Sequence, residues 1–307
     1  MVILNRVSKT FGKIKALDEV TFQVNEGELF GVIGPDGAGK TTLFRILATL
    51  LLPTEGHATI KKHDVVQDFG VLRKITGYMP GQFSLYPDLT VEENLEFYAR
   101  VFRTRVEDNY SLIRDIFTYL EPFRKRRAGN LSGGMKQKLA LSCALIHRPE
   151  ILLLDEPTTG VDPVSRAEFW GLLHNLQKQG LTILVSTPYM DEAAHCNRIA
   201  LLRQGRILGV NTPKGLQEEY SLHLWGLKGE RPALLLPLLR QLPAEFRVYA
   251  AGQEVRVACR ERNGIEKIKA LLETSEKWDH IQISLVQPDV EDCFIALMQE
   301  NNELQYK

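Results

Sequence analysis

The chain has 307 residues, a formal net charge of zero, 44% hydrophobic residues and 25% charged residues. This length accommodates one large and one smaller domain, and the composition is that of a folded globular protein, which excludes a disordered chain. The balanced charge argues against a general nucleic-acid-binding surface, and no apolar run is long enough to span a membrane.

The first 30 residues alternate apolar and polar side chains, which predicts antiparallel strands with turns at Gly12 and at residues 25–27. Phe11 lies beside the first of these turns. An exposed aromatic ring here could stack on a nucleobase, and a buried one would be part of a hairpin core. The pattern alone leaves both roles open.

Residues 34–42 (GPDGAGKTT) satisfy the phosphate-loop pattern, between a predicted buried strand at 29–33 and a predicted helix at 42–48. The glycines let the backbone approach phosphates, and the helix start directs N–H groups at an anion. We expect Lys40 to reach the β- and γ-phosphates of a bound nucleotide and Thr41 to bind Mg²⁺. The predicted nucleotide-binding residues of this loop are Gly34, Pro35, Asp36, Gly37, Ala38, Gly39, Lys40, Thr41 and Thr42.

Two short strands, near residues 58–60 and 75–79, precede a mostly helical region over 91–120. Thr90 and Glu93 have the spacing of a capping box at its start. A basic cluster at 124–127, predicted to be a solvated helix end, is followed by the sequence NLSGGM at 130–135 and an apolar helix that ends at His147. Ser132, Gly133 and Gly134 can bind a phosphate presented from outside or simply cap this helix.

Residues 151–154 predict a buried strand that ends in two carboxylates, Asp155 and Glu156. Behind a phosphate loop, such a strand is typical of the Mg²⁺-binding partner: Asp155 would hold the metal and Glu156 would polarise the attacking water. A helix at 163–179, a strand at 182–186, a helix at 190–196 and a hairpin at 199–210 complete a parallel α/β nucleotide-binding core.

From about residue 219 the predicted order is β-α-β-β-α-β, which is the ferredoxin-like pattern. The strands are expected at 222–227, 246–250, 254–259 and 281–286, and the helices at 232–242 and 265–272, with a last helix at 290–298. No catalytic cluster stands out there, which favours a regulatory or interface role. The predicted fold is therefore an α/β P-loop NTPase core (1–218) with an antiparallel β subdomain and a helical subdomain (about 88–148), followed by a small C-terminal α+β domain (219–307).

Residues 1–215 resemble the ATP-binding subunit of an ABC transporter. Residues 34–42 match its Walker A motif, 131–135 (LSGGM) its signature motif, 151–156 its Walker B motif and 160–163 (GVDP) its D-loop. The segment PDVEDCFIAL at 288–297 is similar to the tail of drug and antibiotic export ATPases that work with ABC-2 type permeases. The resemblance implies that Phe11 stacks on adenine and that Ser132, Gly133 and Gly134 bind the ATP held by a second subunit.

The chain departs from the family at two positions of its own ATP site. Pro188 follows Ser186-Thr187 where the family has a histidine, and proline cannot make that residue's contact with the γ-phosphate. Gly81 stands where the family has a glutamine, and Gln82 follows one residue later. Gln82 would reach Mg²⁺ and the attacking water only if the loop shifts.

The resemblance implies an ATPase that uses ATP and Mg²⁺ to power an ABC-2 type permease through closure of a dimer, with Glu156, Lys40 and Gln82 as catalytic candidates and Thr41, Asp155 and Gln82 as metal candidates. The expected partners are the permease and a second ATP-binding subunit, identical or a companion chain, without nucleic acid. The expected location is cytoplasmic, at the inner face of the membrane. Two alternatives are a nucleotide-gated subunit that does not hydrolyse ATP, which Glu156 argues against, and a soluble ABC ATPase, which the single Walker A motif and the lack of heptads argue against.

Overall fold

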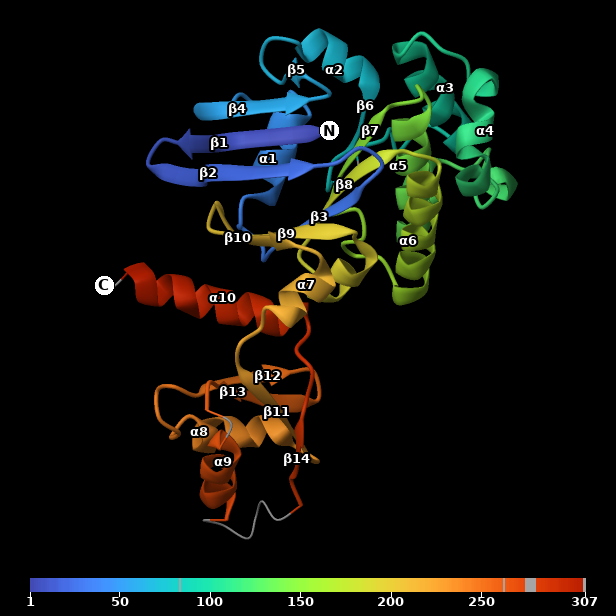
Figure 1. The fold of residues 1–307 in the computed structure, drawn as a ribbon. Helices are drawn as coiled ribbons and strands as arrows, with labels where there is room; N and C mark the ends of the chain where they lie inside the picture. The colour runs from blue at the N-terminus through green and yellow to red at the C-terminus, as the bar shows by residue number, and fades with distance from the viewer. Residues whose placement is uncertain (83, 262, 274–279, 306–307) are drawn as a thin grey trace. The chain divides into compact units, whose positions relative to one another are not determined.

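The computed structural model describes residues 1–82, 84–261, 263–273 and 280–305 (Figure 1). The chain divides into two compact units, residues 1–213 with 303–307, and residues 214–302. No described helix is both long enough and apolar enough to cross a bilayer.

An antiparallel four-stranded sheet forms one part of the first unit, as the alternating N-terminal pattern predicts. Val2 pairs with Val24 on one side and with Ile60 on the other, and the buried side chains of Val2 and Leu4 lie on the same face. The strands in sheet order are β2 (Ile14–Val24), β1 (Val2–Phe11), β4 (Glu55–Ile60) and β5 (His63–Asp64).

A six-stranded sheet carries the core of this unit, and five of its strands are parallel. Its central strands are short and wholly buried, as expected for strands covered on both faces. The order is β10 (Arg206–Asn211), β9 (Arg198–Arg203), β3 (Leu29–Ile33), β8 (Thr182–Thr187), β7 (Ile151–Asp155) and β6 (Thr76–Met79). The predicted α/β core is confirmed.

Helix α1 (Lys40–Leu47) lies between the two sheets, where Leu43, Phe44 and Leu47 share one apolar core with strands of both. Helix α6 packs against β3 and β8. The other helices of this unit are α2 (Phe69–Ile75), α3 (Val91–Val101), α4 (Val106–Phe117), α5 (Gly133–Leu145) and α6 (Pro163–Lys178), and α7 (Pro213–Glu218) crosses the boundary between the units.

The capping box predicted from Thr90 and Glu93 is present at the start of α3. Glu93 N–H donates to Thr90 Oγ1 at 3.2 Å, and Thr90 N–H donates to Glu93 Oε2 at 2.8 Å. The helix expected at 190–196 is a 3₁₀ helix over Met190–His195.

The second unit has the ferredoxin-like topology that its element order predicts. Its strands are β12 (Arg247–Ala251), β13 (Glu254–Cys259), β11 (His223–Lys228) and β14 (Gln282–Leu285), in that sheet order, and all neighbours are antiparallel. Helices α8 (Leu236–Leu239) and α9 (Gly264–Leu272) share a core with one face of this sheet. The helix predicted at 232–242 is divided into a 3₁₀ turn (Pro232–Leu235) and α8, because Pro237 lacks the N–H that a continuous helix needs.

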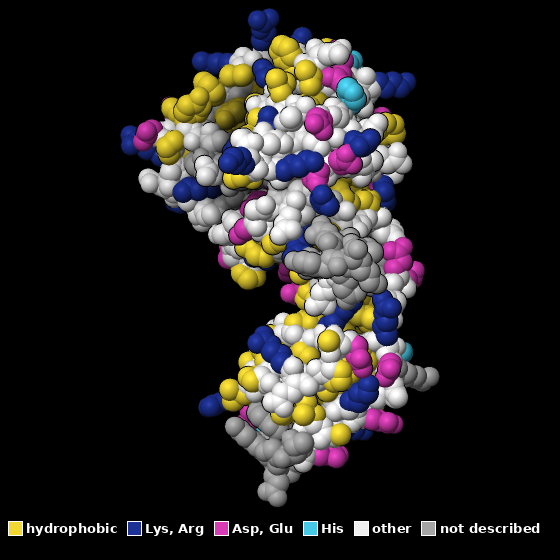
Figure 2. Space-filling model, turned by 90° about the vertical axis from the view of Figure 1, so that its left-hand side faces the viewer, with side chains coloured by type: hydrophobic (Ala, Val, Ile, Leu, Met, Phe, Trp, Pro, Cys, Tyr) yellow, Lys and Arg dark blue, Asp and Glu magenta, His cyan; other side chains and the backbone are white. Residues whose placement is uncertain are grey.

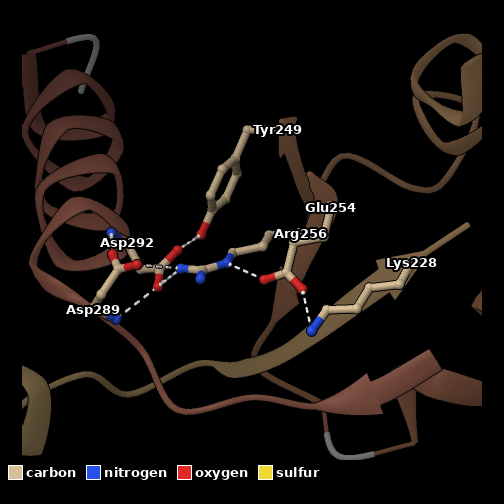
Figure 3. Close-up of polar contacts among 6 residues, drawn as sticks. All are labelled: Lys228, Tyr249, Glu254, Arg256, Asp289 and Asp292. Atoms are coloured by element: carbon tan, nitrogen blue, oxygen red, sulfur yellow. Dashed lines mark hydrogen bonds and ion pairs between the residues drawn. The ribbon is translucent and has the colours of Figure 1, made fainter. Parts of the chain in front are cut away.

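A polar network covers part of the other face of this sheet and fixes the start of α10 (Val290–Gln305) (Figure 3). Arg256 pairs with Asp292, with Asp289 at 2.7 Å and with Glu254 at 3.0 Å. Tyr249 donates to Asp292, whose side chain is fully buried. Burial lowers the pKa of Arg256, but its hydrogen bonds to these carboxylates outweigh burial and raise it overall.

On the face drawn in Figure 2, basic and acidic side chains are interspersed, with hydrophobic side chains between them. This distribution agrees with a net formal charge of zero.

Candidate nucleotide-binding site

The predicted phosphate loop connects the carboxyl end of β3 to the start of α1. A Cβ added to Gly34 would lie 2.0 Å from the carbonyl oxygen of Leu202 in β9, so only glycine fits there. Gly37 and Gly39 have φ angles of +77° and +108°, which residues with a Cβ rarely adopt. The glycines thus allow both the close packing and the turn.

Lys40 is buried at the first position of α1 and binds the loop that precedes it. Its Nζ donates to the carbonyl oxygens of Gly34 at 2.7 Å and Pro35 at 2.9 Å. It also pairs with Glu156 Oε1 at 3.1 Å. The ammonium group is therefore held where the phosphate loop meets the end of β7.

Asp155 ends β7 next to the phosphate loop, as its motif predicts. Its Oδ1 accepts hydrogen bonds from Ser186 Oγ at 2.7 Å and from Thr41 Oγ1 at 3.3 Å. Burial raises the pKa of the Asp155 carboxyl, and the two hydroxyl donors offset part of that rise. A buried carboxylate beside a threonine hydroxyl is a set of hard oxygen ligands that suits Mg²⁺.

Glu156 has a left-handed backbone, with a φ of +51°. For a residue other than glycine this conformation costs about 1 kcal/mol or more, and it persists only where the surroundings impose it. Here its N–H is bound by the hydroxyl of Ser186 at 3.0 Å. The conformation leaves the Glu156 side chain partly exposed and paired with Lys40.

Position 81 lies directly against this pair of carboxylates, because a Cβ on Gly81 would be 3.0 Å from the carbonyl oxygen of Asp155 and 3.8 Å from Cβ of Glu156. Gln82 is exposed. Phe11, at the end of β1, is also exposed, and the Lys9 ammonium lies 5.2 Å from the centre of its ring. That Gln82 and Phe11 contact the nucleotide remains a prediction.

The signature residues lie at the start of α5, with Ser132 as its N-cap. Ser132 and Gly133 are exposed, whereas Gly134 is buried. A Cβ on Gly133 would lie 3.5 Å from the carbonyl oxygen of Gly160 in the D-loop. A Cβ on Gly134 would lie only 2.5 Å from Oγ of Ser165 in helix α6. Gly134 is therefore a packing glycine between α5 and α6, a role that the sequence did not indicate.

The structure brings Lys40, Thr41, Asp155 and Glu156 together, as predicted. Sequence reasoning missed the role of Ser186, which binds both the Asp155 carboxylate and the Glu156 N–H. The signal was present: Ser186 follows the apolar run of the strand next to β7, and parallel neighbours end at the same edge of a sheet.

Comparisons with known proteins identify the family of this chain. The family described as "ABC transporter" matches residues 17–159. The chain is 39% identical over 304 residues to the probable multidrug ABC transporter ATP-binding protein YbhF of Escherichia coli, covering 97% of this chain and 52% of that protein. The chain thus spans about half the length of this relative.

Other relatives match over nearly their whole length. The chain is 32% identical over 318 residues to the doxorubicin resistance ATP-binding protein DrrA of Mycobacterium tuberculosis, covering 98% of this chain and 95% of that protein. It is 35% identical over 305 residues to the Nod factor export ATP-binding protein I of a Rhizobium species, covering 95% and 94%.

Among solved structures, a dimeric post-hydrolysis state of the ATP-binding cassette MJ0796 bound to ADP and Pi matches with a TM-score of 0.62 and 31% identity. The match covers 69% of this chain and 98% of that one. The comparisons confirm the resemblance seen in the motifs: this chain belongs to the ATP-binding proteins of ABC transporters, a family of transport-coupled ATPases.

Proposed function

We propose that the chain binds and hydrolyses ATP and powers an ABC-2 type exporter permease through ATP-driven closure of a dimer. The observation that carries the proposal is the convergence of Lys40, Thr41, Asp155 and Glu156 at one edge of the parallel sheet. The names of the relatives, which refer to multidrug transport, doxorubicin resistance and Nod factor export, favour an export system.

The residues of this edge fit ATP with Mg²⁺. The glycines at 34, 37 and 39 provide a backbone cradle, and the Lys40 ammonium would exchange its loop carbonyls for phosphate oxygens. Thr41 and Asp155 would hold the metal, which supplies charge neutralisation to the phosphates when bound. Glu156, which pairs with Lys40, would orient and polarise a water molecule.

A second ATP-binding subunit would complete each site. Ser132 and Gly133 are exposed at the start of α5 and have N–H groups that can bind a phosphate from outside the chain. The related cassette MJ0796 is dimeric in its ADP- and Pi-bound structure, which supports the same assembly here.

An apolar groove of about 450 Å³ supports docking of a permease segment. It lies between the segment after α1, the loop that follows β6, and helices α3 and α5. Leu50, which is 58% exposed, lies at this groove, and Leu52, 61% exposed, follows it in the chain. A bound permease would place the chain at the inner face of the membrane.

The chain's own site would be slow, because Pro188 and Gly81 replace two polar side chains of the family motif. Its signature is intact and could complete a faster site on a companion ATPase. A homodimer with two slow sites is the alternative arrangement, and a subunit that only binds ATP is the second candidate function. Glu156 and its contact with Lys40 favour hydrolysis over binding alone.

The test is Mg-ATP turnover by the purified chain beside Glu156→Gln, with ATP binding measured for both. A matched control is Glu150→Gln, because Glu150 also pairs with a lysine but lies just before the opposite end of β7. Turnover that only Glu156→Gln abolishes supports hydrolysis at this site and a homodimer. Tight ATP binding without turnover by the wild type or either variant contradicts hydrolysis at this site. It identifies a non-hydrolysing subunit that needs a companion ATPase.

A further inference from the structure

Glu192 lies in the 3₁₀ helix Met190–His195, and its carboxylate is buried, with 2% of the side chain exposed. Its Oε2 accepts hydrogen bonds from two hydroxyl groups: Thr158 Oγ1, at 3.0 Å, and Thr187 Oγ1. Its Oε1 faces the guanidinium of Arg166, with Nε at 3.6 Å. One carboxylate therefore has three protein partners.

The three partners come from the three segments that surround the candidate site. Thr158 follows Glu156 by two residues, in the loop after β7. The carbonyl oxygen of Thr187 accepts the N–H of Gly34 in the phosphate loop at 3.3 Å. Arg166 is in the first turn of α6, which begins at the D-loop cap Asp162.

We propose that Glu192, together with Arg166, is a positioning residue for ATP hydrolysis, an inference that rests on the proposed function. Pro188 follows Thr187 directly and has no side-chain or backbone donor to offer a phosphate. Glu192 instead binds the end of β8 through the Thr187 hydroxyl, and its contacts with Thr158 and Arg166 connect this strand to the Walker B loop and to the D-loop helix. Small displacements of such groups are costly, because reaction rates depend steeply on alignment.

Glu192 and Arg166 lie close together but do not form a hydrogen bond with each other. Arg166 Nε and Glu192 Oε1 are both buried, and neither has a hydrogen-bond partner among the described residues. A shift of roughly 0.5 Å would bring their 3.6 Å separation into hydrogen-bond range. The guanidinium also lies 4.3 Å from the ring centre of Tyr189, next to Pro188. A tightening of this pair would shorten the distance between α6 and the 3₁₀ helix that carries Glu192.

The test compares Glu192→Gln with Glu28→Gln. Glu28 is the matched control, because it is also a buried glutamate, 7% exposed, that pairs with an arginine, Arg198, at 3.4 Å and accepts the Asn25 N–H. It precedes the amino end of β3, whereas the candidate site is at the carboxyl end. The first readout is hydrogen exchange of the nucleotide-free protein. In Glu192→Gln the amides of residues 158–162, 187, 189 and 190 should exchange about tenfold faster, and in Glu28→Gln they should not.

The second readout is steady-state kinetics with Mg-ATP. Glu192→Gln should lower kcat roughly 10- to 100-fold with little change in KM, whereas Glu28→Gln should leave both constants close to the wild type. Thr158→Val, which removes one hydroxyl and keeps the shape, should produce a smaller change in the same direction and serves if Glu192→Gln does not fold.

Two results would overturn the positioning role. One is hydrogen exchange in the loops of Glu192→Gln at the same rate as in the wild type, and the other is an equal loss of kcat in Glu192→Gln and Glu28→Gln. If the wild-type chain itself shows no turnover, hydrolysis fails as its function, and the exchange comparison alone decides whether Glu192 positions these loops.

Discussion

Replacing Lys40 by methionine tests both the geometry of the site and its role. The substitution keeps an unbranched apolar stem but removes a buried ammonium with three partners: Gly34 O at 2.7 Å, Pro35 O at 2.9 Å and Glu156 Oε1 at 3.1 Å. Removing one member of a buried pair costs about 3–5 kcal/mol. Because the Glu156 side chain is 22% exposed and can be hydrated, we expect about 3 kcal/mol without nucleotide.

Thermal unfolding of the nucleotide-free protein measures this cost. For a unit of this size, about 3 kcal/mol lowers the unfolding midpoint by roughly 6–12 °C. Lys61→Met is the control, because Lys61 pairs with Glu150 at the surface and such a pair contributes less than about 1 kcal/mol. Mg-ATP at 100 times Kd should add about 2.7 kcal/mol to the wild type and to Lys61→Met, and little to Lys40→Met.

Equal midpoints for Lys40→Met and Lys61→Met without nucleotide would refute the binding of Lys40 to its own loop and to Glu156. Equal stabilisation of both variants by Mg-ATP would refute its role in nucleotide binding.

Three further predictions follow from single contacts. Gly34→Ala places a Cβ 2.0 Å from the Leu202 carbonyl oxygen, so ATP affinity measured by fluorescence titration should fall more than about tenfold; unchanged affinity would contradict the close packing. Asp155→Asn should raise the unfolding midpoint at pH 7 and abolish turnover. The raised folded-state pKa of Asp155 means that the wild type loses stability as pH rises from its unfolded pKa to its folded pKa, so the advantage of the variant should shrink as pH falls through that window. A gap independent of pH would contradict this account. Arg256→Met leaves the fully buried Asp292 without its guanidinium partner and should cost about 3–5 kcal/mol in the second unit, with faster hydrogen exchange over residues 290–298. Unchanged exchange would show that the network does not hold α10.

Local patterns predicted the parts of the fold that depend on neighbouring residues. The phosphate loop, the capping box at Thr90 and the β-α-β-β-α-β order of the second unit are all contained in short stretches of sequence. Helix α2 was not predicted, because it has seven residues and its apolar residues Phe69 and Val71 are exposed rather than arranged along a buried stripe. The division of the helix at Pro237 could have been predicted from the proline itself.

Contacts between distant residues could not be predicted in this way. Gly34 needs to be glycine because of Leu202, which lies in another strand, and Gly134 because of Ser165 in another helix. Arg256 and Asp292 are 36 residues apart and meet only when α10 folds onto the sheet. Sequence motifs therefore identify the residues expected to bind a ligand better than the residues that hold them in place.

The two departures from the family pattern, Gly81 and Pro188, leave the phosphate loop, Lys40 and the two carboxylates of the site unchanged. Gly81 and Pro188 both lie at the edge of the sheet where Asp155 pairs with Ser186, and neither residue has a polar side chain. Gly34 N–H still binds the Thr187 carbonyl oxygen, and the carboxylates keep their donors. On the proposed function, such a site would keep the residues expected to bind ATP and would lack one contact to the γ-phosphate and one to Mg²⁺ and the attacking water. On the proposed function, restoring glutamine at 81 or histidine at 188 should therefore change kcat far more than ATP affinity, since the affinity depends on the loop and on Lys40, which are unaltered.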